Sequence, residues 1–151
     1  MNDSQTHARG WLLKAASDLT AARRLVAAGE SYDAACFHAQ QAAEKALKAI
    51  LAAADAPIPR THNLEDLHAQ CLTLSLADVP GDFARLDVSE LTPFAVELRY
   101  DMEFWPERSV AEQAIALASQ VYDAAAALVS SQAASALERN GEHADEPGSQ
   151  S

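Results

Sequence analysis

Residues 32–49 read YDAACFHAQQAAEKALKA, and this stretch decides the fold. Its apolar residues recur three and four positions apart, the spacing that places side chains on one face of an α-helix. Ser31 is a candidate N-cap, and Pro57 and Pro59 end the helix near Ala54 because proline has no N–H to donate. The apolar stripe of this predicted helix consists of Tyr32, Ala35, Cys36, Ala39, Ala43, Ala46, Leu47 and Ile50.

The same periodicity continues on both sides of this stretch. An earlier stripe runs from Trp11 to Val26 and predicts a first helix, which begins at a capping Asp3 or Ser4 and ends at Gly29. Downstream, Asn63 is a candidate cap for a short third helix, and residues 83–98 form a fourth helical region in which Thr92-Pro93 can restart the helix. Ser109 and Glu112 have the spacing of a capping box that opens a long last helix. The sequence therefore predicts an all-α protein, an antiparallel up-and-down helix bundle of about five helices.

Composition sets limits on organisation and partners. A chain of 151 residues favours one domain, and we expect a helical domain over 1–139 followed by a disordered acidic tail over 140–151. The net charge is −11, with 22 acidic and 11 basic residues. Such a chain repels phosphates at long range, so binding to nucleic acid requires a local basic patch.

Several classes of site and location are disfavoured by the sequence. Cys36 and Cys71 lack the spacing of metal ligands, and the chain has no glycine-rich phosphate loop. We therefore expect no metal site and no cofactor. The polar N-terminus does not resemble a signal peptide, and we identify no run of about 18 apolar residues that would suit a bilayer. The expected location is the cytoplasm, with no membrane contact.

Polar side chains on residues 32–49 are the first candidates for function. His38, Gln41, Lys45 and Lys48 alternate three and four apart and share one side of the predicted helix, where Glu44 can pair with Lys48. One interpretation is a solvated face with a stabilising ion pair; the other is a ridge of donors that faces a partner or a phosphate. A second candidate region contains Tyr100, Phe104 and Trp105, which either cap the core or form a dimer contact or base-stacking surface.

The order of these motifs resembles the HEPN family of small prokaryotic helical proteins. The pattern is Phe-His-x-Gln-Gln-Ala-x-Glu-Lys-x-Leu-Lys-Ala over 37–49, then Thr61-His62-Asn63-Leu64, then Arg99-Tyr100, and the resemblance covers roughly residues 8–130. The resemblance implies homodimerisation. It also implies pairing with a minimal nucleotidyltransferase, in a toxin–antitoxin or substrate-presenting role.

Many HEPN proteins are metal-independent ribonucleases that use an Arg-x(4–6)-His motif. No histidine follows Arg99 at that spacing; the only later one is His143, in the predicted tail. We therefore predict a non-catalytic binding module. The alternative is a divergent ribonuclease toxin in which Arg99 acts with a displaced base, His38 or His62, because histidine can transfer a proton near neutral pH.

Two further interpretations concern anion binding and Arg99. A nucleotide or small-anion sensor would use the cationic residues Arg60, His62, Lys45 and Lys48. Arg99 itself is either a scaffold residue paired with Glu97, Asp101 or Glu103, or a binding residue that works with Tyr100 in a cleft shared between subunits. Nucleotide or RNA therefore stays among the expected ligands.

Overall fold

The computed structural model describes residues 2–74, 80–95 and 100–142. The fold is all-α, as predicted, and the described residues contain no strand. The helices are α1 (Asp3–Ala28), α2 (Tyr32–Ala53), α3 (Leu64–Leu72), α4 (Gly81–Arg85), the 3₁₀ helix η1 (Val88–Phe94) and α6 (Arg108–Glu142).

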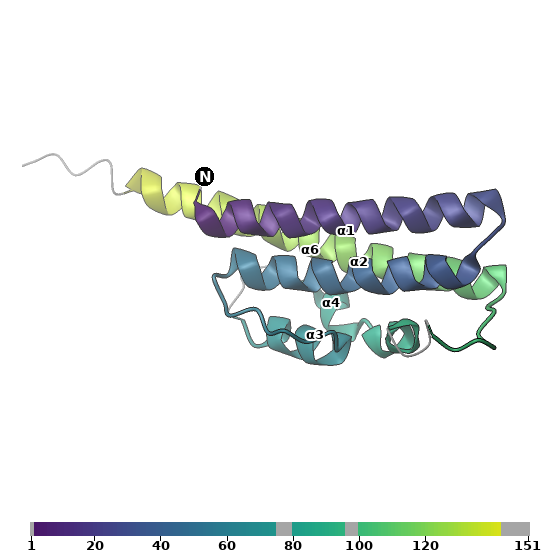
Figure 1. The fold of residues 1–151 in the computed structure, drawn as a ribbon. Helices are drawn as coiled ribbons and strands as arrows, with labels where there is room; N and C mark the ends of the chain where they lie inside the picture. The colour runs from purple at the N-terminus through teal and green to yellow at the C-terminus, as the bar shows by residue number, and fades with distance from the viewer. Residues whose placement is uncertain (1, 75–79, 96–99, 143–151) are drawn as a thin grey trace, which may run out of the picture.

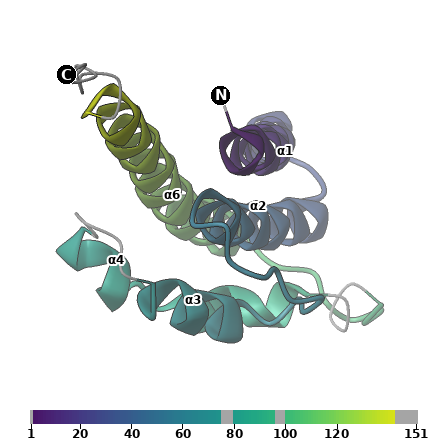
Figure 2. The same cartoon turned by 90° about the vertical axis from the view of Figure 1, so that its left-hand side faces the viewer.

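Helix α2 is the centre of the bundle. It packs against α1 and α6 on one side and against α3 and η1 on the other, and the view along the bundle shows α2 between these two groups (Figure 2). The three long helices α1, α2 and α6 run side by side, and the short elements cover the remaining face of α2 (Figure 1). Helix α2 therefore takes part in the packing on both sides of the bundle.

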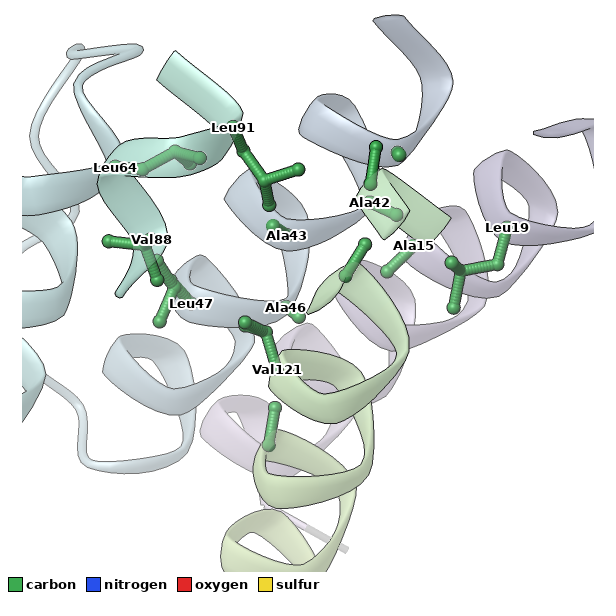
Figure 3. Packing of buried hydrophobic residues seen from close by; sticks show 14 of the residues in the cluster. Ala15, Leu19, Ala42, Ala43, Ala46, Leu47, Leu64, Val88, Leu91 and Val121 are labelled. Carbon is green, nitrogen blue, oxygen red and sulfur yellow. The ribbon is translucent and has the colours of Figure 1, made fainter. Parts of the chain in front are cut away.

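The core is rich in alanine where the long helices meet. Buried side chains from α1, α2, α3, η1 and α6 form one cluster (Figure 3). Alanine has no side chain beyond Cβ, so helices that meet through it can approach closely. Larger residues such as Leu47, Leu64 and Phe83 fill the space between α2 and the short elements.

The predicted helix boundaries hold within a few residues, but three of the predicted side-chain cap bonds are not formed. α1 is capped by Asn2, whose side chain accepts from Gln5 N at 2.9 Å, and not by Asp3 or Ser4. Ser31 occupies the N-cap position of α2, as predicted, but it adopts a left-handed conformation with φ 53° and its side chain makes no cap bond.

The predicted capping box is the third error. α6 begins at Arg108, so Ser109 lies inside the first turn, and Glu112 accepts a 2.7 Å hydrogen bond from Arg108 Nε. Two stop and start signals are confirmed. Gly29 ends α1 at φ 72°, and the Asn63 side chain accepts from Asp66 N at 3.0 Å.

Two regions differ in extent from the prediction. The fourth helical region consists of two short pieces, α4 and η1, and Pro93 lies inside η1 instead of opening a new helix. α6 continues to Glu142, three residues beyond the expected domain end at 139, and residues 143–151 lie outside the described residues.

α6 also corrects the expectation that no segment suits a bilayer. Within the described residues, the stretch 108–141 is long and apolar enough to cross a membrane by length and composition. The buried helix of a water-soluble bundle satisfies the same criterion, and α6 packs against both α1 and α2.

Candidate functional site

Asp18 joins α1 to two cationic side chains of α2. Its carboxylate is nearly buried: Oδ1 lies 2.9 Å from His38 Nδ1, and Oδ2 lies 2.5 Å from Lys45 Nζ. Because His38 and Lys45 are seven residues apart, two helical turns separate them and one carboxylate on the neighbouring helix can meet both. We call these three residues the Asp18 cluster.

Glu44 forms a second cluster, with partners on α2 and in the loop before α3. Its carboxylate is 5% exposed; Oε1 lies 2.8 Å from His62 Nδ1, and Oε2 lies 3.8 Å from Lys48 Nζ. The buried Gln40 side chain donates to the backbone carbonyl of His62 at 3.5 Å. The loop before α3 is thus tied to α2 at two atoms of His62. We call Glu44, Lys48 and His62 the Glu44 cluster.

Lys48 also contacts α1. Its Nζ lies 5.5 Å from the centre of the Trp11 ring, over the ring face, which is the geometry of a cation–π contact. Trp11 is held in turn by its indole N–H, which donates to His7 Nε2 at 3.1 Å. Lys48 therefore links Glu44 of its own helix to the aromatic side chain of α1.

These contacts correct both interpretations of the α2 ridge. The predicted Glu44–Lys48 pair is confirmed, but the solvated face is wrong, because Lys48 is 7% exposed. The predicted single ridge of donors is also wrong: His38 and Lys45 turn to Asp18, Lys48 turns to Glu44 and Trp11, and Gln41 donates to Gln40 Oε1 at 2.7 Å. The polar side chains of this α2 ridge therefore mainly make contacts within the protein.

His38 and His62 each use one ring nitrogen for the bond to a carboxylate, and the other ring nitrogen is the position that could transfer a proton. A carboxylate only accepts hydrogen bonds, so Nδ1 of His38 and of His62 must donate to its carboxylate, and Nε2 is left as the second ring position. The His62 side chain is 67% exposed and that of His38 is 33% exposed. A histidine oriented by a carboxylate in this way is the arrangement that supports proton transfer in many enzymes.

Two other predicted site residues, Arg60 and Tyr100, are exposed. Arg60 is exposed in the loop before α3. Tyr100 is 70% exposed in the segment that leads to α6. Arg99 and its predicted partner Glu97 lie outside the described residues, as does His143.

The segment 100–107 carries the most exposed large apolar side chains of the described chain. Phe104 packs against Phe94 of η1, with ring centres 5.9 Å apart, whereas Met102 is 86% exposed and Trp105 is 76% exposed. Asp101 shapes the turn, because its side chain accepts from Glu103 N at 3.0 Å and its carbonyl accepts from Phe104 N at 3.2 Å. The core-capping interpretation therefore holds for Phe104 and is wrong for Trp105.

The cysteines behave as core residues. Burial raises the pKa of the Cys36 thiol to about 11 and that of the Cys71 thiol to about 12. Both are therefore protonated at neutral pH, which makes them poor nucleophiles and poor ligands. No group of three or more histidine, cysteine or carboxylate side chains among the described residues could hold a metal ion.

The sequence reasoning about sites misses Asp18 and also Gln40, which lies beside the Glu44 cluster and donates to the carbonyl of His62. Asp18 lies on the apolar stripe of α1, three residues after Ala15 and four before Ala22, and a carboxylate in such a stripe signals a buried ion pair. Gln40 is fully buried and lies next to the predicted ridge. The chain positions of Asp18 and its partners are 20 and 27 residues apart, so the pairing depends on how α1 and α2 pack.

Comparisons with known proteins agree with this architecture. The family model of the HEPN domain matches residues 8–128. The crystal structure of TT1696 from Thermus thermophilus is 30% identical, covers 81% of this chain and 98% of its own, and superposes with a TM-score of 0.67. A structure described as ST0689, an archaeal HEPN homologue, is 24% identical, covers 82% of this chain and 98% of its own, and has a TM-score of 0.61.

A comparison with curated proteins finds no match. The match to the family model extends over most of the chain and includes both polar clusters on α2. The chain therefore belongs to the HEPN domain family.

Proposed function

We propose that this HEPN protein is a non-catalytic binding module that recognises another protein, a minimal nucleotidyltransferase, through segment 100–107. The observation that carries the proposal is the exposure of Met102 and Trp105 beside Asp101, Glu103 and Glu107. Exposed apolar side chains grouped in a short, well-anchored turn are typical of protein interaction sites, and tryptophan and methionine are enriched there.

The state of the α2 side chains supports a binding role over catalysis. Lys45 and Lys48, the residues expected to face an anion, each contact a carboxylate. A lysine already paired in this way gives little attraction to a phosphate. Three of the four residues of the predicted anion sensor, Lys45, Lys48 and His62, therefore already have a carboxylate partner.

Affinity purification from the source organism tests the proposal. The tagged protein is expected to recover a nucleotidyltransferase at a fixed ratio, and the double variant Met102→Ala/Trp105→Ala is expected to lose it. The matched control is Leu13→Ala on α1, because Leu13 is 73% exposed and lies in another element. Recovery of no nucleotidyltransferase by the wild-type protein contradicts the proposal.

A second surface, on α6, supports the expected homodimer. Between Gln113 and Leu137, α6 carries only one charged residue, Asp123, and Leu137 is 73% exposed. A helix face that is rich in alanine and carries a single charge suits contact with a second copy of the chain. Sedimentation equilibrium is expected to give twice the 16.1 kDa mass of the monomer, and Ala127→Glu on the exposed side of α6 is expected to shift the protein to monomer.

One observation favours the ribonuclease as a second candidate. His38 and His62 are each oriented by a carboxylate, as a general base would be. An RNA cleavage assay separates the two functions: the binding module predicts no cleavage by the pure protein. Cleavage that is lost in both His38→Gln and Arg99→Ala, without loss of fold, would establish the ribonuclease instead.

A further inference from the structure

We propose that the groove between the end of α1 and the start of α6 binds a small organic anion, a carboxylate or phosphate group joined to a short apolar body. This site is independent of the protein-binding function proposed above. The groove has a volume of about 290 Å³ and is lined by Arg23, Val26, Ala27, Arg108, Glu112 and Ile115. The lining residues come from the last turns of α1 and the first turns of α6, and Figure 1 shows these two helix ends at the same end of the bundle.

Both arginines of the groove are held in position by neighbouring side chains. Arg23 Nη2 donates to Ser119 Oγ at 2.8 Å, and Arg108 Nε donates to Glu112 Oε1 at 2.7 Å. A guanidinium has five N–H donors in a fixed plane, so each arginine keeps donors for a ligand after making its bond. Side chains that are oriented before binding lose less freedom when the ligand arrives.

The charge of the lining favours an anion. The lining residues contain two arginines and one carboxylate, and that carboxylate, Glu112, pairs with Arg108. Within the described part of the chain, Arg23 has no ion pair with an acidic residue; its hydrogen-bond partner is the neutral Ser119. Because the rest of this protein is strongly acidic, an uncompensated arginine in a groove is a local site of attraction for an anion.

The apolar residues that line the groove indicate that the ligand also has an apolar part. Val26 is buried and Ile115 is half-buried, and both line the groove together with Ala27. A carboxylate or phosphate can bind a guanidinium through two parallel hydrogen bonds, while the chain or ring attached to it covers these apolar side chains. A simple inorganic anion would gain only the first of these contacts.

The experiment titrates ¹⁵N-labelled full-length protein with hexanoate, hexyl phosphate, acetate, inorganic phosphate and hexylamine. We expect hexanoate or hexyl phosphate to shift the amide resonances of residues 23–27 and 108–115, and to bind at least about tenfold more tightly than acetate or inorganic phosphate. Hexylamine is expected to leave the spectrum unchanged, because it presents a cation to Arg23. The two hexyl ligands distinguish a carboxylate site from a phosphate site.

Variants assign the binding to the groove. Arg23→Gln is expected to weaken hexanoate or hexyl phosphate about tenfold or more, whereas Arg24→Gln, the adjacent exposed arginine, is expected to change the affinity by less than about twofold. Ile115→Ser is expected to reduce the preference of the protein for hexanoate over acetate. Arg23 and Arg24 are both exposed, so each variant is expected to fold, and circular dichroism checks it.

Three results would overturn the proposal. The first is an unchanged spectrum with both hexyl ligands up to about 20 mM, a concentration that detects even weak binding. The second is equal loss of affinity in Arg23→Gln and Arg24→Gln, which would indicate general attraction to α1. The third is equal affinity for hexanoate and acetate, which would mean that the apolar side chains take no part.

Discussion

Glu44 is the most deeply buried side chain of the two clusters, with 5% of it exposed. Its carboxylate meets His62 of the loop and Lys48 of its own helix. Lys48 in turn covers the ring of Trp11 in α1. Since Glu44 and Lys48 are both buried, removal of one charge leaves the other without a partner in a place that water reaches poorly, and the cost of that is large.

Glu44→Ala is accordingly expected to lower the free energy of unfolding by about 3 kcal/mol. Urea denaturation followed by circular dichroism measures it. The control is Glu112→Ala, which removes the exposed pair with Arg108 and is expected to change stability by less than about 1 kcal/mol. Equal losses in the two variants would show that the Glu44 cluster adds no more than a surface pair.

The cysteine thiols give a second prediction at this scale. In the folded protein the pKa values are about 11 for Cys36 and about 12 for Cys71, raised by burial from the ordinary 9.0. The stability that comes from burying neutral thiols is therefore complete below pH 9 and is lost as the pH rises toward 11 and 12.

At pH 8 a thiol reagent is expected to react with the folded protein at least about a hundredfold more slowly than with the chain in 6–8 M urea (roughly the range that unfolds small domains), because the thiolate is scarcer and buried. The absorbance of a disulfide-exchange reagent measures this. Equal rates in the two states would mean that both cysteines are accessible in the fold.

At the scale of elements, the helix caps show what the sequence can and cannot predict. Asn63 is predicted as a cap and is one, because its side chain reaches Asp66 N. Ser31 has an equally suitable side chain, but it follows the turn at Gly29 in a left-handed conformation, and its side chain makes no cap bond. Residue type indicates a cap; the backbone conformation decides whether the side chain can make the bond.

Asn63→Ala is expected to reduce the free energy of unfolding by about 1 kcal/mol, since the first turn of α3 loses its side-chain acceptor. Ser31→Ala, the matched control at the start of α2, is expected to stay within about 0.5 kcal/mol of wild type. Thermal unfolding of the two variants compares them directly. A larger effect of Ser31→Ala would contradict the assignment of the caps.

The ion pairs of the two clusters also show where prediction from sequence ends: a pair within one helix is predictable, and a pair between two helices is not. Periodicity pairs Glu44 with Lys48 correctly, because both lie on one helix. It does not give the pairing of Asp18 with His38 and Lys45, since this depends on the rotation of α1 against α2. The exposure of Trp105 is likewise not predictable, because an aromatic segment has the same sequence pattern whether it covers the core or faces a partner.

At the scale of the whole molecule, the alanine-rich core limits how the long helices pack. Ala46 of α2 and Val121 of α6 are both fully buried in the main cluster (Figure 3).

Ala46→Leu is expected to destabilise the protein by about 2 kcal/mol, because the larger side chain separates helices that meet through small residues. Ser17→Leu, at an exposed position of α1, is the control for a leucine on a helix, and urea denaturation of both variants measures the difference. A neutral Ala46→Leu would mean that the core has room that the packing does not indicate.

The central claim is that this HEPN protein acts by binding a nucleotidyltransferase through Met102 and Trp105. The most direct test is the dissociation constant between the purified protein and the nucleotidyltransferase recovered with it, measured by isothermal titration calorimetry. We predict that Met102→Ala/Trp105→Ala weakens binding at least about a hundredfold, since two exposed anchors of an interface are lost, and that Leu13→Ala leaves it unchanged. Equal affinity of the double variant and the wild-type protein would contradict the account.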